Sequence, residues 1–117
     1  MNKRAVGSDY EEKACEFLQT QGFSVLERNF RCRRGEIDII AREGKYLVFV
    51  EVKYRTTRSQ GEPEAAVDFR KQRRISRVAL YYLTVRGYPE TTSCRFDVVG
   101  VDPDGFSLIR NAFDYIP

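Results

Sequence analysis

One run of seven residues places the tightest constraint on how this chain folds. The segment LVFVEVK, residues 47–53, is apolar on both faces until its end. This pattern is typical of a β-strand that is buried on both sides rather than one with a solvated face. The charged residues Glu51 and Lys53 are therefore anomalous within it.

The preceding segment is expected to pair with this strand. Residues 36–41 and 46–53 both have strand character, and the turn-forming sequence REGK lies between them at 42–45. Because side chains alternate along a strand, Glu51 and Lys53 point to the same face. If the two segments form a hairpin, Asp38 converges with both of them.

Such a convergence needs a compensating cation. Two carboxylates about 4 Å apart repel each other by roughly 4 kcal/mol at an effective dielectric constant of 20. The pair Asp38 and Glu51 therefore calls for Lys53, a divalent metal ion, or both.

The order of these residues resembles a known nuclease motif. An acid, a spacer with a turn and then Glu-x-Lys is similar to the PD-(D/E)xK motif, with Asp38, Glu51 and Lys53 in its three positions and Ile37 in place of the proline. The surrounding sequences GEIDIIA, FVEVKYR, KQRRI, RFDVV and IRNAF resemble the YraN family of small bacterial proteins over nearly the whole chain. That family is similar to archaeal Holliday-junction resolvases. The resemblance implies an α/β, restriction-endonuclease-like three-layer domain with a central mixed β-sheet flanked by helices.

The resemblance also implies a function. It indicates a metal-dependent endonuclease that hydrolyses phosphodiester bonds in DNA, with branched or otherwise structured DNA as a candidate substrate and, by analogy with the resolvases, a homodimer as the assembly. Asp38, Glu51 and the Val52 carbonyl are hard oxygen ligands that suit Mg²⁺ or Mn²⁺, and Lys53 is placed to orient the attacking water. The alternatives are a nucleic-acid binding module of the same fold without turnover and a scaffold that recruits repair or processing proteins.

Two further acids are candidate metal ligands. Glu11 lies at the apolar edge of the first predicted helix, where it either forms a capping box with Ser8 or reaches the metal, as the first-helix glutamate does in the resolvases. Glu36 shares a face with Asp38 by the same alternation, yet it opens its strand and so either supplies a third acid or meets solvent or a neighbouring arginine.

Basic residues flank the acidic centre. The net charge of +3 alone does not indicate nucleic acid, but positive groups on both sides of the acids suit a polyanion whose backbone approaches a metal. A solvated charged surface is the alternative. For Gln72 the alternatives are contact with the attacking water or a backbone oxygen and an ordinary exposed helix position, and we favour the second. The predicted nucleic-acid-binding residues are Arg33, Arg34, Arg55, Arg58, Arg70, Lys71, Gln72 and Arg74.

Length and composition limit the remaining possibilities. A chain of 117 residues that is 42% hydrophobic supports one core, so we expect a single domain over residues 1–117. The sequence contains neither a membrane-length apolar run nor a signal-peptide core, which predicts a cytoplasmic protein without membrane association. Three cysteines without any histidine are expected to be reduced packing residues.

The remaining elements follow from periodicity and turn chemistry. In the first part of the chain we expect a helix at 2–21, an edge strand at 23–30 and a loop or bulge at 31–35. After the central hairpin we expect a mobile loop at 56–62 that closes over substrate and a helical turn at 63–67. A helix at 69–86 capped by Asp68 and a strand hairpin at 94–101 and 106–113 complete the chain. Asp97 lies within the first strand of that hairpin, where we favour a structural ion pair over catalysis.

Overall fold

Two α-helices and five strands form the described part of the protein. The computed structural model describes the backbone of residues 3–55 and 63–117 and the side chains of residues 9–55, 63 and 65–117. In chain order the elements are α1 (Lys3–Thr20), β1 (Ser24–Cys32), β2 (Gly35–Glu43), β3 (Tyr46–Tyr54), the 3₁₀ helix η2 (Pro63–Ala66), α2 (Phe69–Val85), β4 (Cys94–Asp102) and β5 (Gly105–Phe113). The predicted loop at 56–62 lies outside the described residues.

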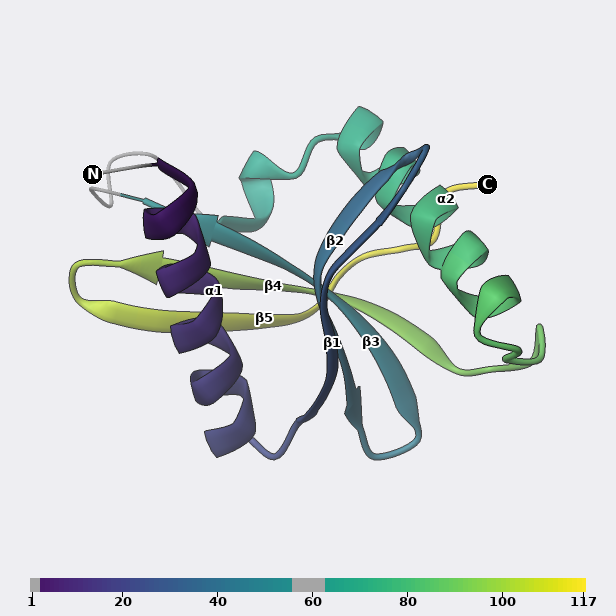
Figure 1. The fold of residues 1–117 in the computed structure, drawn as a ribbon, viewed down its shortest axis with the longest axis horizontal. Coiled ribbons are helices and arrows are strands. Elements are labelled where there is room, and N and C mark those ends of the chain that lie inside the picture. Colours follow the sequence, from purple (N-terminus) through teal and green to yellow (C-terminus); the bar gives the residue numbers. More distant parts are fainter. Residues whose placement is uncertain (1–2, 56–62) are drawn as a thin grey trace.

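The five strands form one mixed sheet in the order β1-β2-β3-β4-β5. β3 and β4 are parallel, and the other neighbouring pairs are antiparallel. A parallel pair needs a crossover, and α2 supplies it between β3 and β4. The two helices lie on opposite sides of the sheet (Figure 1). The predicted three-layer α/β fold with a central mixed sheet is therefore confirmed.

Strand β3, which contains the apolar segment 47–53, lies at the centre of the sheet and is buried on both faces. Val48 and Val50 of β3 pack in the cluster under α1, whereas Leu47 and Phe49 pack in the cluster under α2. Glu51 and Lys53 follow the second pair in alternation, so they point to the side of the sheet that α2 covers. Neither helix within residues 3–55 and 63–117 is both long and apolar enough to cross a membrane.

The cysteines pack against the two cores. Cys15 is buried in the cluster under α1, and Cys32 and Cys94 are half-buried beside the cluster under α2. All three are free thiols, as expected.

One local prediction is wrong, and one of the two alternatives for Glu11 is excluded. The loop expected at 31–35 is only a two-residue turn, because β1 continues to Cys32 and pairs there with Gly35, whose φ of 144° closes the hairpin without steric cost. The capping box is excluded, because α1 begins at Lys3 and Ser8 lies inside the helix, whereas a cap has to precede it.

Two predicted polar contacts are confirmed. Asp68 caps α2, with its carboxylate accepting a hydrogen bond from the Lys71 amide. Asp97 is fully buried and accepts two hydrogen bonds from Arg95, at 2.8 Å and 2.7 Å. Arg95 also contacts Glu43 at 2.6 Å, and Arg110 contacts the second Glu43 oxygen at 2.7 Å. This ion-pair network joins β2, β4 and β5 at the β2–β3 turn.

Candidate active site at the end of strand β3

The acids converge where β2 and β3 separate. The last paired residues of the β2–β3 ladder are Ile39 and Val50. Immediately beyond this pair the Asp38 side chain takes over as acceptor, because its Oδ2 receives the Val52 amide N–H at 2.8 Å. Asp38 and Glu51 are only 8% and 7% exposed. The structure therefore brings two carboxyl groups together in a largely desolvated position at the carboxyl end of a central strand.

Two lysines contact the same Glu51 oxygen. Lys53 Nζ lies 3.6 Å from Glu51 Oε1, and Lys71 Nζ lies 2.8 Å from it. Lys71 comes from the first turn of α2, which the Asp68 cap fixes at the Lys71 amide. Sequence reasoning placed Lys71 among the nucleic-acid-binding residues and did not foresee this ion pair. Only the docking of α2 on the face that carries Glu51 creates it.

The electrostatics of Asp38 reflect its surroundings. The pKa of Asp38 is raised from 3.8 to about 7 in total, chiefly by burial and next by the Glu51 carboxylate. The Val52 N–H opposes the shift because it hydrogen-bonds the charged form. Glu11 and Glu36 raise the pKa further, with smaller effects. An additional positive charge at this position would stabilise the ionised acid.

The two lysines differ in their electrostatics. Burial lowers the pKa of Lys53, the neighbouring Lys71 lowers it further, and Glu51 only partly opposes these effects. For Lys71, burial alone lowers the pKa, but the short hydrogen bond to Glu51 outweighs it and the pKa is raised. Lys71 is therefore the stronger ion-pair partner of Glu51. The positive charge of Lys53 is less fully compensated by the neighbouring carboxylate.

The other two acids lie at the margin of the site. Glu36 is exposed and its Oε2 accepts a hydrogen bond from Arg31 Nε at 2.8 Å, which is the arginine pairing that the sequence left open. Glu11 lies on α1 and is half-buried. Both are near enough to raise the pKa of Asp38, and neither makes a direct contact with it among the described interactions.

The residues present fit a hard divalent cation in an open site. Among the residues that the structure describes, no three Asp, Glu, Cys or His side chains are grouped so as to hold a metal ion by themselves. Mg²⁺, however, is usually bound through one or two carboxylates and keeps several waters. Asp38, Glu51 and the Val52 carbonyl provide such a set, and the mutual repulsion of the two buried acids favours a cation between them.

The predicted nucleic-acid-binding residues fall into three groups. Arg55 is buried, Gln72 is half-buried and donates its side-chain amide to the Val67 carbonyl, and Arg58 lies outside the described residues. Lys71 is engaged with Glu51. The remaining four are exposed on the β1–β2 turn and on α2: Arg33, Arg34, Arg70 and Arg74.

The three-layer α/β arrangement, with a five-stranded mixed sheet between two helices, is a restriction-endonuclease-like fold. The chain belongs to the uncharacterised protein family UPF0102, which matches residues 10–101 and is the YraN family that the sequence motifs resemble.

Relatives match over essentially their whole length. A UPF0102 protein of Lachnoclostridium phytofermentans is 55% identical over 114 residues, which cover 97% of each chain. One from Caldicellulosiruptor saccharolyticus is 47% identical and covers 97% of this chain and 100% of the relative. One from Alcanivorax borkumensis is 42% identical, with coverage of 96% and 94%.

Proposed function

We propose that this protein is a metal-dependent endonuclease that hydrolyses phosphodiester bonds in DNA. The observation that carries the proposal is the meeting of Asp38, Glu51 and Lys53 at the carboxyl end of β3, where both acids are buried and repel each other. In open α/β sheets this end of parallel strands is the usual place for a ligand. A purely structural ion pair does not need the second acid.

Each group at the site has a chemical role in hydrolysis. Asp38, Glu51 and the Val52 carbonyl are the groups that would hold Mg²⁺ or Mn²⁺, which when bound acidifies water and offsets charge on the phosphate. The Val52 N–H fixes one Asp38 oxygen, and Lys71 fixes Glu51. Lys53 Nζ orients the attacking water and stabilises the negative charge that builds up in the transition state.

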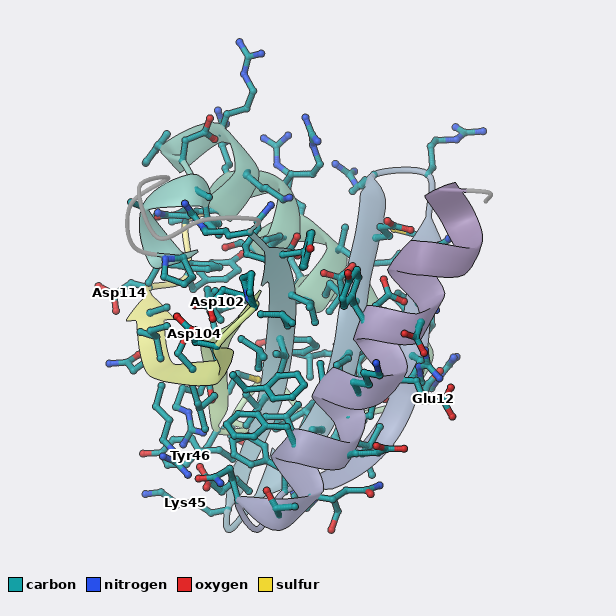
Figure 2. All side chains as sticks on the ribbon, turned by 90° about the vertical axis from the view of Figure 1, so that its left-hand side faces the viewer. Glu12, Lys45, Tyr46, Asp102, Asp104 and Asp114 are labelled. Carbon is teal, nitrogen blue, oxygen red and sulfur yellow. The ribbon has the colours of Figure 1, made fainter. Side chains whose placement is uncertain are left out.

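A cleavage assay with matched variants tests the proposal. Purified protein is incubated with junction, flap, nicked and single-stranded DNA in the presence of Mg²⁺ or Mn²⁺. Asp38→Asn and Lys53→Ala are expected to slow cleavage by about 100-fold, since each removes a group that stabilises the transition state. The controls are Asp114→Asn and Lys45→Ala, which change two exposed residues, labelled in Figure 2, that follow β5 and lie in the β2–β3 turn, respectively. If Asp38→Asn and Lys53→Ala cleave as fast as the wild type, the assignment is wrong.

A non-catalytic nucleic-acid binding module is the second candidate. The Lys71 ammonium already lies 2.8 Å from Glu51, so the protein supplies an internal cation at one of the two acids. Binding to DNA is then salt-dependent but indifferent to divalent metal. Tight binding with no cleavage of any of the four substrates, and with the same affinity in EDTA and in Mg²⁺, favours this candidate.

A further inference from the structure

Five arginines surround one hollow beside the candidate active site. The hollow has a volume of about 280 Å³ and is lined by Arg34, Arg70, Arg73, Arg74 and Arg77. A second hollow of about 540 Å³ shares the lining residue Arg34 with the first, and its other lining residues are Cys32, Arg33 and Tyr81. We call the two hollows together the arginine groove. Arginine stays charged at any physiological pH, so this groove collects positive charge that titration does not remove.

The arginines of the groove differ from several arginines elsewhere in the protein. Arg31, Arg86 and Arg95 each form an ion pair with a carboxylate at 2.8 Å or less. For the guanidinium groups that line the 280 Å³ hollow, no ion pair with an acid is present in the part of the chain that the structure describes. Like charges gathered without internal counter-charge favour an anionic ligand.

The groove has one wall from α2 and one from the β1–β2 turn. The α2 residues recur at intervals of three and four, which places them along one face of the helix. The aliphatic part of Arg74 packs directly over Gly35, where a Cβ would lie 3.0 Å from Arg74 Cδ. Figure 1 shows the tip of the β1–β2 hairpin beside α2. The absence of a side chain at Gly35 therefore allows the two walls to approach.

One end of the groove lies near the acids. Lys71, which contacts Glu51, lies one helical turn before Arg74. From Lys71 to Tyr81 the helix rises about 15 Å, at 1.5 Å per residue. A ligand in the groove would therefore have one end near the candidate active site.

Tyr81 adds an exposed aromatic ring at the end of the groove that lies further from the acids. It is 45% exposed, and its ring lies against Phe30 with the ring centroids 6.3 Å apart. An exposed aromatic ring next to phosphate-binding groups is a platform on which nucleic-acid bases stack, and only an unpaired base has a free face for it.

We propose that the arginine groove binds a single-stranded segment of DNA, with backbone phosphates at the arginines and an unpaired base on Tyr81. This deepens the proposed function, because it places such a segment next to the acids. The substrate is then DNA with an unpaired arm rather than a continuous duplex.

Fluorescence anisotropy in EDTA tests the groove without requiring catalysis. The probes are a labelled 12-nucleotide single strand and the matching duplex. The wild type is expected to bind the single strand at least five-fold more tightly than the duplex. Arg77→Gln is expected to weaken single-strand binding by at least three-fold, whereas Arg110→Gln removes the same charge outside the groove and is expected to leave it unchanged.

Variants of Tyr81 separate stacking from charge. Tyr81→Leu is expected to lower the affinity for the single strand and not for the duplex. Tyr81→Phe, which keeps an aromatic ring, is expected to bind the single strand as tightly as the wild type. Equal binding of both probes, or no effect of Tyr81→Leu, overturns the inference. Displacement of the strand by inorganic phosphate at equal concentration also overturns it, because the groove is then a simple anion pocket.

The outcome is separable from that of the cleavage assay. If the strand binds in the expected way but is never cut, the groove is correct and the nuclease proposal fails. If DNA is cut while Arg77→Gln and Tyr81→Leu bind like the wild type, the nuclease proposal stands and the groove is wrong.

Discussion

Asp38 does two things at once in this structure. Its carboxylate replaces a main-chain acceptor for the Val52 amide, and it also faces the Glu51 carboxylate across the opening between β2 and β3. The first role stabilises the fold, and the second destabilises it without a bound cation. Removing only the charge separates the two roles.

Asp38→Asn is therefore expected to be as stable as the wild type or more stable at pH 8 in EDTA. The amide oxygen still accepts the Val52 N–H, and the repulsion from Glu51 disappears. Adding Mg²⁺ is expected to raise the melting temperature of the wild type and not that of the variant, because a ligand stabilises only the protein that binds it. Thermal unfolding with and without Mg²⁺ measures both effects. A loss of more than about 3 kcal/mol in EDTA would instead indicate a buried structural pair with Lys53.

Contacts between individual side chains are the features that the sequence alone predicts least well. Alternation along the strand correctly predicted that Glu51 and Lys53 share a face, because that depends only on local geometry. The contact of Lys71 with Glu51 depends on how α2 docks on the sheet, which no local pattern encodes. The pairing of Glu36 with Arg31 remained one of two alternatives for the same reason.

At the scale of elements, Glu43 holds together strands that are not all neighbours. Its two oxygens contact Arg95 of β4 and Arg110 of β5, across the intervening β3. The pKa of Glu43 is lowered to about 2, chiefly by the hydrogen bond from Arg110 and also by Arg95, while burial opposes both. A lowered pKa means that folding favours the ionised acid.

Glu43→Gln is therefore expected to cost about 2 kcal/mol of stability at pH 7, after allowance for the partial exposure of the pair. The contribution of Glu43 is present above its ordinary pKa of 4.5 and is lost as the pH falls toward about 2. The difference between wild type and variant is thus expected to shrink over that range, as urea unfolding at several pH values would show. Glu90→Gln, which removes an exposed acid outside the network, is the control. A difference that stays constant down to pH 3 would contradict the assignment.

The elements themselves were largely predictable. Strand β3 has a continuous apolar run and helix α2 has a clear helical periodicity, and the structure has both within two residues of the expected ends. The β1–β2 hairpin was missed because its turn residues, Arg33 and Arg34, are not the asparagine, aspartate or glycine that signal a tight turn. Gly35 is the only local turn signal, and a single glycine does not distinguish a tight turn from a longer loop.

In the molecule as a whole, the charged residues that form structural ion pairs lie apart from the charged residues that are available to a ligand. The Glu43 network lies at the β2–β3 turn, whereas the acids and the arginine groove lie at the opposite end of these strands. A net charge of +3 is too small to indicate a polyanion, and sequence alone could not assign the free arginines to one groove. The position of these charges matters more than their sum.

Salt dependence measures this arrangement. The logarithm of the affinity for a single strand is expected to fall with the logarithm of the salt concentration, by about 0.7 for each phosphate that is neutralised. Arg73→Gln is expected to reduce the slope by about that amount. Arg31→Gln, which removes a charge already paired with Glu36, is expected to leave it unchanged. Equal slopes for the two variants would mean that the protein responds only to its net charge.

The hydrogen bond between Asp38 and Val52 has a consequence for how this protein can change over generations. Asparagine satisfies the same amide, so under the proposed function a single codon change would abolish hydrolysis while the sheet, the helices and the groove persist. Descendants that only hold nucleic acid are then one mutational step from those that cut it. Sampling position 38 across present-day lineages would reveal which have taken that step.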